Sequence, residues 1–352
     1  MFQEIENNRK ALLTYIESAY HFSDENLLQQ RSELLHQEGI ITQRPYIESG
    51  AKYRLGKMFA ELDIDKKIAD VLTSLAKSKL LFNPPYLHQV EAIEKILSSR
   101  KNIIVTTGTG SGKTECFLLP ILGRLIEEAP KPSFKQRAVR TLLLYPMNAL
   151  VNDQLGRLRV LFGSKTCFDF FKKTTGRPIK FGRYTGRTLF PGLLPNPNDS
   201  NFSSKMQQKL AGLSFYYKIA DRALKNQDEK EQKKASDVIQ QLYKKGKFPV
   251  KHSATGNPAQ GFCDWFGQSG GRWLQNGKLA RTIERADDSE LLVRHEMQNT
   301  PPDILVTNYS MLEYMLLRPI ERNIFSITKS FYQENPDERF ILVLDESHLY
   351  NG

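Results

Sequence analysis

The stretch VTTGTGSGKTE, residues 105–115, contains the residue types that bind a phosphate group. Glycines alternate along it, and only glycine lets consecutive backbone N–H groups approach an anion this closely. Lys113 can reach the β- and γ-phosphates of a nucleotide, and the Thr114 hydroxyl can bind Mg²⁺. A chance Gly/Ser linker is the alternative, but an apolar run before the loop and a helical pattern after it argue against that interpretation. We therefore predict a nucleotide site at Thr109, Gly110, Ser111, Gly112, Lys113 and Thr114.

The second half of such a site is an acidic pair at the end of an apolar run, FILVLDESH, residues 340–348. Asp345 would hold Mg²⁺, directly or through water, and Glu346 would orient and polarise the attacking water. An acidic turn after a strand is common on its own, but the match with the phosphate loop weakens that interpretation. The two segments together predict hydrolysis of a nucleoside triphosphate, with Lys113, Asp345 and Glu346 as catalytic residues.

The composition excludes several classes of protein. The 352 residues are 40% hydrophobic, which is enough to bury a full core. No apolar run approaches the roughly 18 residues that span a bilayer, and Met1 begins a polar segment instead of a signal peptide. The 3 cysteines lie far apart without a CxxC pair, so neither a zinc site nor a disulfide framework is predicted. We expect a cytoplasmic protein with no membrane partner.

Positive charge is concentrated in one segment. The formal net charge is +11, and the segment from residue 165 to residue 187 has 7 basic residues against one acid, Asp169. Such a cluster fits a polyanion such as nucleic acid. A solvated basic face is an equally good interpretation of the charge alone. The basic residues are Lys165, Lys172, Lys173, Arg177, Lys180, Arg183 and Arg187.

The order of apolar runs and helical patterns predicts an α/β fold. From about residue 81, short apolar runs each precede a helical pattern, which is typical of a parallel sheet flanked by helices. Residues 1–80 have helical patterns and no catalytic motif, and residues 191–290 interrupt the order with a mostly helical insertion. Active residues should follow the carboxyl ends of the strands. The predicted strands are 102–106, 141–145, 179–184, 303–307 and 340–345.

These segments resemble the motifs of a known family. VTTGTGSGKTE and LDESH are similar to motifs I and II of the superfamily 2 DEAD/DEAH-like helicases. PYLHQVEAI, LLLYPMNALVNDQLGRL, GRYTGRT and PPDILVTNYSMLEYML are similar to the other motifs and come in the family's order. Thr107 stands where the general phosphate-loop pattern has glycine, and in this family that position is often another residue. The resemblance implies that residues 81–352 form the amino-terminal RecA-like P-loop NTPase lobe, which binds ATP and Mg²⁺.

The resemblance also implies roles for residues within those motifs. Gln89 would read the adenine edge, and Tyr86 would stack on the base. Thr114 and Asp345 would be the ligands of Mg²⁺, and His348 would help relay the nucleotide state across a cleft. A groove for a nucleic-acid strand would contact phosphates and sugars, so little sequence preference is expected. The groove residues would be Pro146, Asn148, Thr185, Gly186, Arg187, Thr307 and Asn308.

Two departures from the family pattern narrow the resemblance. The acidic motif reads Asp-Glu-Ser-His, and Asn148 stands where DEAD-box proteins usually have an arginine. Both departures make the sequence more similar to large bacterial helicases that contain the segments YPMNAL and TNYSMLE. Several of those helicases belong to phage-defence gene clusters. The resemblance therefore favours single-stranded DNA or a duplex junction over RNA, and it implies a role in antiviral defence.

The resemblance further implies a partner lobe. Helicases of this kind bind ATP between two RecA-like lobes, and the second lobe supplies arginine fingers. Only 4 residues follow His348, so we expect the second lobe in a longer chain or in a partner subunit, and weak hydrolysis by this chain alone. One alternative is a nucleotide-gated module that binds nucleic acid or recruits partners without unwinding. Another is a nucleic-acid-binding protein with a vestigial loop, against which the intact Lys113 and Asp345 argue.

Overall fold

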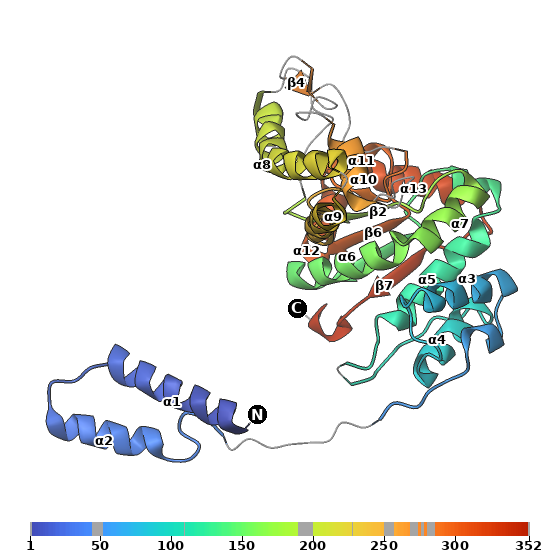
Figure 1. The fold of residues 1–352 in the computed structure, drawn as a ribbon. Coiled ribbons are helices and arrows are strands. Elements are labelled where there is room, and N and C mark those ends of the chain that lie inside the picture. Colours follow the sequence, from blue (N-terminus) through green and yellow to red (C-terminus); the bar gives the residue numbers. More distant parts are fainter. Residues whose placement is uncertain are drawn as a thin grey trace. The chain divides into compact units, whose positions relative to one another are not determined.

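A computed structural model describes most of the chain. The described residues are 2–43, 52–108, 110–188, 200–226, 228–249, 257–267, 274–275, 278–279 and 286–350. They divide into two compact units, Met1–Lys52 and Tyr53–Gly352 (Figure 1). Among these residues, no helix has both the length and the hydropathy needed to cross a lipid bilayer.

The first unit is a pair of helices, α1 (Phe2–Ala19) and α2 (Glu25–His36). Asp24 caps α2, because its carboxylate accepts hydrogen bonds from the backbone N–H groups of Asn26 at 2.9 Å and Leu27 at 3.1 Å. These bonds satisfy two of the donors that the start of a helix leaves without partners. All α2 side chains keep contact with solvent, so the pair buries little apolar surface. The unit carries none of the predicted site residues.

The second unit is built on a parallel sheet of 5 strands in the order β5-β2-β6-β1-β7. The pairing of β1 with β6 runs from Thr141 opposite Ile304 to Tyr145 opposite Asn308, and the remaining pairs in this sheet are parallel too. This register brings the carboxyl ends of the strands to one edge. The predicted parallel sheet is confirmed. The strands are β1 Thr141–Tyr145, β2 Phe181–Tyr184, β5 Glu290–Leu291, β6 Ile304–Asn308 and β7 Ile341–Leu344.

Residues 102–106, which were predicted to be a strand, form no strand in the structure. That prediction is wrong. Strand β7 is the outer strand on its side of the described sheet, and Ile104 is 91% exposed. An extended segment becomes a strand only where a neighbour pairs with its backbone N–H and C=O groups, and a β-branched run cannot provide that neighbour by itself. Strand β5 was not predicted, because its two residues lie at the end of the expected insertion and form no long apolar run.

Helices cover both faces of the sheet, as predicted (Figure 1). Helices α3 to α7 share one apolar core with β1, β2 and β6. Helices α11, α12 and α13 pack through a second apolar cluster on the other face. The helices are α3 Lys66–Lys77, α4 Leu87–Leu97, α5 Glu115–Glu128, α6 Asn148–Phe162, α7 Lys165–Thr175, α11 Arg294–Asn299, α12 Tyr309–Leu317 and α13 Arg322–Glu334, with 3-10 turns at Phe59–Glu61, Pro132–Lys135 and Ser347–Tyr350.

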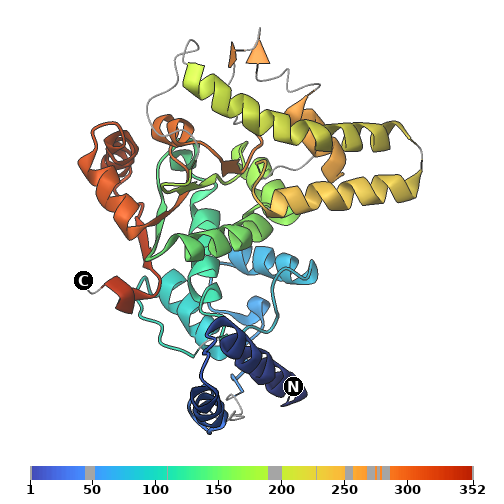
Figure 2. The same ribbon diagram turned by 90° about the vertical axis from the view of Figure 1, so that its left-hand side faces the viewer.

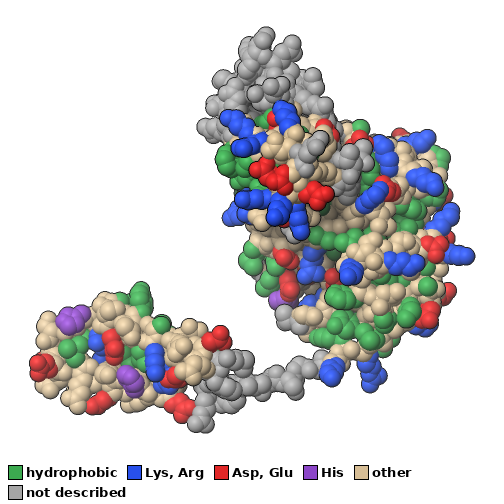
Figure 3. All heavy atoms as spheres, in the orientation of Figure 1, with side chains coloured by type: hydrophobic (Ala, Val, Ile, Leu, Met, Phe, Trp, Pro, Cys, Tyr) green, Lys and Arg blue, Asp and Glu red, His purple; other side chains and the backbone are tan. Residues whose placement is uncertain are grey.

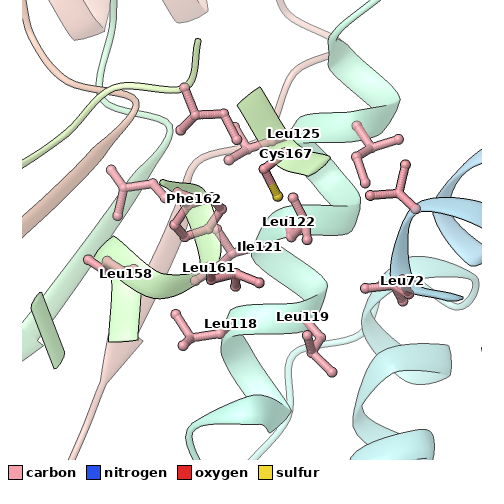
Figure 4. Close-up of a cluster of buried hydrophobic side chains, with 14 of the residues drawn as sticks. Leu72, Leu118, Leu119, Ile121, Leu122, Leu125, Leu158, Leu161, Phe162 and Cys167 are labelled. Carbon is pink, nitrogen blue, oxygen red and sulfur yellow. The ribbon is translucent and has the colours of Figure 1, made fainter. Parts of the chain in front are cut away.

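Helix α5 lies at the centre of the larger core. Figure 4 shows Leu118 and Leu122 of α5 between Leu158 of α6 and Leu72 of α3. None of these side chains is more than 4% exposed, and complete burial of a leucine side chain contributes roughly 1.5–3 kcal/mol. Helix α3 therefore belongs to the core of the second unit, although the sequence grouped it with the amino-terminal region.

Three further helices form an apolar cluster of their own, which we call the helical cluster. Helices α8 and α9 lie side by side (Figure 2), and helix α10, which carries the buried Trp265, packs against both. Tyr243 of α9 donates its hydroxyl hydrogen to the carbonyl of Arg159 at 2.8 Å, which fixes the helical cluster to α6. These helices fall within the predicted insertion, whose boundaries stay a prediction. The elements are α8 Ser200–Lys225, α9 Glu229–Lys244 and α10 Pro258–Phe266, followed by the antiparallel strands β3 Leu274–Gln275 and β4 Lys278–Leu279.

Asp303 links the amino-terminal ends of the three central strands. Its buried carboxylate accepts hydrogen bonds from Arg140 Nη1 at 2.9 Å, before β1, and from Arg177 Nη1 at 2.7 Å, before β2. The backbone N–H of Lys180 donates to it at 2.8 Å. Burial alone would raise the pKa of this carboxyl, but the charges of Arg177 and Arg140 outweigh burial and hold the pKa well below the usual range. These contacts fix the starting points of β1, β2 and β6 relative to one another.

We expect Asp303→Asn to lower the free energy of unfolding by about 3–5 kcal/mol, because two largely buried guanidinium groups lose their shared counter-charge. Since the folded-state pKa of Asp303 is below its unfolded value, the stabilisation is present above about pH 4 and is lost as the pH falls further. Urea unfolding at a series of pH values measures both effects. The control is Asp169→Asn in the exposed pair with Lys165, which should cost less than about 0.5 kcal/mol. Equal effects of the two substitutions would contradict the structural role of Asp303.

Candidate nucleotide and nucleic-acid site

The phosphate loop leads directly into α5, which begins at Glu115. Gly110 and Gly112 both have a φ angle of +76°, which residues with a side chain rarely adopt. A Cβ atom added to Gly112 would lie 2.4 Å from Gln89 Nε2. Position 112 therefore requires glycine both for its backbone angle and for the close approach of Gln89. Thr109, predicted to bind the nucleotide, lies outside the described residues.

Side-chain hydrogen bonds hold the loop in shape. Lys113 Nζ donates to the carbonyl of Thr107 at 3.1 Å, and the hydroxyl oxygens of Thr107 and Ser111 are 2.6 Å apart. Ser111 is fully buried. Thr107, where the general pattern has glycine, thus stabilises the loop through its carbonyl and its hydroxyl. To bind a nucleotide, Lys113 would exchange this carbonyl for a phosphate oxygen.

Helix α4 couples the predicted adenine-binding residues to the loop. The buried Gln89 donates from Nε2 to the carbonyl of Gly112 at 3.0 Å and accepts at Oε1 from the backbone N–H of Tyr86 at 2.9 Å. His88 Nε2 lies 3.0 Å from the carbonyl oxygen of Ser111, and its ring stacks on Tyr86 with centroids 5.8 Å apart. Gln89 therefore positions the loop here, and its adenine-reading role stays a prediction. His88 was missed, although its place beside Gln89 in PYLHQVEAI was an available signal.

The acidic pair follows β7 and lies close to the phosphate loop. The backbone N–H of Asp345 donates to the carbonyl of Leu144 at 3.1 Å, which continues the pairing of β7 with β1. Burial raises the pKa of the Asp345 carboxyl and the charge of Glu346 adds to the rise, whereas the charges of Lys113 and Arg157 oppose it. Arg157 also pairs with Glu115 at the end of the phosphate loop, with Nη1 3.4 Å from Oε1, and so connects the two halves of the site.

Glu346 has an unusual backbone conformation. Its φ angle is +51°, and its N–H donates to Oδ1 of Asp345 at 3.0 Å. Such a conformation costs roughly 1–3 kcal/mol and recurs at functional sites, although Lys79 and Arg100 adopt it outside the site. The Glu346 side chain is 36% exposed, and His348 Nδ1 lies 3.5 Å from one of its carboxylate oxygens. Water can therefore reach the Glu346 carboxylate, and the relay role of His348 stays a prediction.

Thr114 and Asp345 form a set of oxygen donors that suits Mg²⁺. Thr114 is buried at the end of the loop, and its side chain makes no capping hydrogen bond to α5, so its hydroxyl oxygen is available to a ligand. Hydroxyl and carboxylate oxygens are hard donors, and Mg²⁺ usually adds waters and phosphate oxygens to one or two of them. The described part of the chain has no group of three or more metal-ligating side chains. These two residues could hold the ion in the manner that the sequence predicts.

Three residues that the sequence analysis missed lie around the acidic pair. Arg157 of α6 acts on Asp345 through its charge. Tyr350 donates its hydroxyl hydrogen to the carbonyl of Leu144 in β1 at 2.8 Å. The hydroxyl of Tyr145 is buried and has no hydrogen-bond partner in the described structure. Arg157 could have been found from the segment NDQLGRL, but the isolated tyrosines give no pattern in the sequence.

The predicted groove residues gather at the carboxyl ends of β1, β2 and β6. Asn308 Nδ2 donates to Asn148 Oδ1 at 2.9 Å, and Asn308 Oδ1 accepts from the N–H of Met311 at 2.7 Å, which caps α12. Thr307 Oγ1 donates to the carbonyl of Tyr184 at 2.6 Å. These bonds link β6 to both of its neighbours at the edge where active residues were expected.

Exposure divides the groove residues into two groups. Thr185 is held inside the protein: its carbonyl accepts a hydrogen bond from Arg294 Nη2 at 2.6 Å, and its hydroxyl accepts one from the N–H of Arg187 at 3.3 Å. The buried group, which shapes the edge, consists of Thr185, Thr307 and Asn308. The other group is half-buried or exposed, so a nucleic-acid strand could touch it. It consists of Pro146, Asn148, Gly186 and Arg187. Contact with a strand stays a prediction.

The basic cluster at residues 165–187 is not one continuous surface. Arg177 is occupied by Asp303, and the buried Lys180 donates to the carbonyl of Asp288. Two more cations, Lys165 and Lys172, pair with surface carboxylates. Neither a polyanion surface nor a solvated face therefore describes the whole cluster. The members without an ion pair to a described carboxylate are Lys173, Arg183 and Arg187.

The fold and the site together define the class of protein. A parallel sheet with a glycine-rich loop before α5 and an acidic pair after β7 is a RecA-like P-loop NTPase lobe. The sequence profile of the DEAD/DEAH box helicase family matches residues 86–181, which contain the phosphate loop and the Gln89 segment. Residues 86–181 therefore belong to a DEAD/DEAH box helicase domain, in agreement with the motifs of the sequence.

Several curated proteins are similar to this chain. Druantia protein DruE of Escherichia coli is 40% identical over 356 residues, which cover 99% of this chain and 18% of that protein. ATP-dependent RNA helicase DBP7 of Meyerozyma guilliermondii is 32% identical over 127 residues, covering 36% of this chain and 16% of the relative. Uncharacterized ATP-dependent helicase MJ1574 of Methanocaldococcus jannaschii is 36% identical over 101 residues, which cover 29% of this chain and 13% of that protein. The chain spans less than one fifth of each of these relatives. No solved structure matches it.

We expect Gly112→Ala to weaken ATP binding about tenfold or more, because the added methyl group displaces Gln89 and the positive φ angle disfavours any side chain. The left-handed conformation should also cost about 1–2 kcal/mol in the free energy of unfolding. Titration with a fluorescent ATP analogue and urea unfolding measure the two effects. The control is Gly156→Ala within α6, where an added Cβ meets no atom within 4 Å, and which should be neutral or stabilising by about 0.4–1 kcal/mol. Unchanged ATP binding by Gly112→Ala would show that this loop does not bind the nucleotide.

Proposed function

We propose that this chain is the ATP-binding lobe of an ATP-dependent DNA helicase or translocase. One observation carries the proposal: Arg157 pairs with Glu115 at the end of the phosphate loop and acts through its charge on Asp345, so it connects two motifs that are distant in the sequence. The half-buried Asn148 and the exposed Arg187 lie at the carboxyl ends of strands in the parallel sheet. Because the nucleotide site and the nucleic-acid-binding surface share one rigid sheet, the nucleotide state can change the affinity for the nucleic-acid strand.

Each residue of the nucleotide site has a distinct role in this proposal. Backbone N–H groups around Gly110 and Gly112 bind phosphate oxygens, and Lys113 neutralises charge on the β- and γ-phosphates. Thr114 and Asp345 would hold Mg²⁺, which supplies further neutralisation of phosphate charge when bound. Because burial raises the pKa of Asp345, its carboxylate takes up a proton at a higher pH than an ordinary aspartate does. As the pH falls, Mg²⁺ binding should therefore weaken earlier than binding to an ordinary aspartate would.

The nucleic acid in this proposal is single-stranded DNA or a duplex junction. The acidic motif and Asn148 support DNA over RNA, because they depart from the pattern of the RNA-remodelling DEAD-box proteins. The likeness to Druantia protein DruE extends over 99% of the chain, whereas that to the RNA helicase DBP7 covers 36%. The resemblance to large bacterial helicases of phage-defence clusters supports a role in antiviral defence in the cytoplasm.

A second RecA-like lobe, in a longer chain or in a partner subunit, completes the catalytic site in this proposal. Both Glu346 and His348 are accessible from outside the lobe, with side chains 36% and 70% exposed. An arginine supplied across such an interface accelerates hydrolysis by roughly 10³–10⁵. This chain alone should therefore bind ATP and hydrolyse it weakly.

A nucleotide-gated binding module is the second candidate. Such a module would use the same loop to bind ATP and to change its affinity for nucleic acid or for a partner protein, without unwinding. The strained backbone of Glu346 favours the motor, because nucleotide binding alone does not require a carboxylate held in position for water.

We expect Glu346→Gln to retain ATP binding and to lower the rate of hydrolysis by roughly 10²–10⁴, since it removes the group that orients the attacking water. Phosphate release under single-turnover conditions measures the rate, with Lys113→Ala as the blank. Glu313→Gln is the matched control, because Glu313 is an exposed residue of α12 outside the site. Hydrolysis by Glu346→Gln at the rate of that control would contradict the role assigned to Glu346.

The complete assembly with the second lobe separates the two candidates. A motor unwinds a labelled duplex, and Glu346→Gln abolishes the unwinding while strand binding in the ATP state remains. A binding module shows no unwinding even as wild type. In the same assembly, fluorescence anisotropy should give a higher affinity for single-stranded DNA than for RNA of equal length. A higher affinity for RNA would overturn the choice of DNA.

A further inference from the structure

A cavity of about 590 Å³ lies between the helical cluster and the β5 edge of the sheet. Its walls come from α6, from the end of β2 and the turn that follows, from α8, from the end of α9 and from β5. The volume falls within the roughly 300–1,000 Å³ typical of sites for small ligands. None of the lining residues belongs to the phosphate loop or to the acidic pair. The cavity is therefore separate from the proposed ATP site.

Contacts between α6, β5 and the turn after α9 fix the walls of the cavity. Arg159 of α6 reaches Glu290 of β5 through two hydrogen bonds, Nε to Oε2 at 2.8 Å and Nη2 to Oε1 at 2.7 Å. Gly246, after α9, has a φ angle of +63°, and an added Cβ there would lie 2.2 Å from Nη2 of Arg159. The chain after α9 thus packs directly against the Arg159 guanidinium. These contacts give the cavity a defined shape.

The cavity has an excess of positive charge. The pair formed by Arg159 and Glu290 is neutral as a whole. Burial lowers the pKa of Arg183, and the charges of Arg159 and Arg187 lower it further, whereas the charge of Glu290 opposes them. Figure 3 shows Lys and Arg side chains together with Asp and Glu side chains over the part of the molecule that contains α8 and α9. An anion between these cations would relieve their mutual repulsion. The lining cations that pair with no carboxylate among the described residues are Arg183, Arg187, Lys245 and Lys247.

The rest of the lining includes an aromatic ring and apolar side chains. Tyr216 of α8 is half-buried, and its ring meets that of Phe215 edge-on with centroids 5.5 Å apart. Leu213 and Leu291 are further members of the lining. An aromatic ring and leucines beside several cations suit a ligand that combines a planar base with a phosphate group.

The cavity continues the exposed part of the groove edge. Arg183 and Arg187 flank the turn at Thr185, and both line the cavity. Thr188 holds this turn, because its hydroxyl donates to the carbonyl of Arg183 at 2.6 Å and accepts from the N–H of Thr185 at 2.9 Å. A strand that passes the exposed Gly186 and Arg187 would therefore reach the cavity directly.

We infer that this cavity binds one nucleotide of the nucleic-acid strand, with the phosphate among Arg183, Arg187, Lys245 and Lys247 and the base against Tyr216. The inference rests on the proposed binding of a nucleic-acid strand. It assigns the helical cluster a function, because α8 supplies the aromatic ring and the turn after α9 supplies the two lysines. The contacts are to a phosphate and to the face of a base, so the site should have little sequence preference.

The test is fluorescence anisotropy with a labelled oligothymidine strand, on the 352-residue chain carrying Lys113→Ala so that the phosphate loop does not contribute. Lys245→Gln with Lys247→Gln should weaken binding about tenfold and should reduce the slope of log affinity against log salt by about 0.7–1.4. Tyr216→Leu should weaken binding roughly 5- to 100-fold, and that loss should disappear for an abasic strand. The matched control is Lys233→Gln with Lys234→Gln, two exposed lysines of α9 outside the cavity.

The outcomes separate this inference from the proposed function. Selective loss of binding in the cavity variants, with the Lys233 and Lys234 control unchanged, supports the cavity as a nucleotide site. If the parent chain binds the nucleic-acid strand and the cavity variants bind it as tightly as the control does, the cavity site is overturned. The proposed function then still stands. Absence of strand binding by the chain with an intact Lys113 overturns both. The substituted lysines are exposed, so the fold should persist, and circular dichroism checks this.

Discussion

The buried carboxylate of Asp303 is the interaction on which the geometry of the second unit depends. It binds two guanidinium groups and a backbone N–H at the amino-terminal ends of β1, β2 and β6. Parallel strands that are aligned at one end are also aligned at the other, so this contact sets the relative positions of Asn148 and Asn308 at the opposite edge. A slipped register would leave a buried charge without its partners, at a cost of several kcal/mol. The site is thus positioned by a contact at the far end of its strands.

Much of this fold follows from the sequence, because each predicted element carries a local signal. The runs that form β1, β6 and β7 are mostly apolar, as expected for strands between two helical layers, and β2 is the most polar of these four strands. The glycine at 112 marks a backbone angle that residues with a side chain rarely adopt and a close approach of Gln89 that an added side chain would prevent. Residues 102–106 carry the same apolar signal as the strands, yet a strand needs a neighbour, and their sequence contains no information about one. The amphipathic pattern of α3 likewise predicts a buried face without saying which core buries it.

The candidate site was predictable in its chemistry and less so in its exposure. Lys113 and Asp345 belong to short motifs whose residue types are set by phosphate and Mg²⁺, so their identities are visible in sequence. Burial depends on contacts between distant segments, which the sequence does not show. Thr185 and Thr307 were therefore expected to contact a nucleic-acid strand, although both are buried. The cavity beside β5 had no signal at all. Its cations come from β2, from the turn after it and from the turn after α9, and only the folded chain brings these segments together.

The account rests on the phosphate loop as a site for ATP, and one measurement tests this most directly. Isothermal titration calorimetry of the chain with Mg-ATP, compared with the Lys113→Ala variant, reports binding without requiring a second lobe or a nucleic acid. We predict saturable binding that the substitution weakens about tenfold or more, because a charge-assisted hydrogen bond contributes about 1.5–3 kcal/mol. Absence of saturable binding, or equal affinity of the two proteins, would contradict the account.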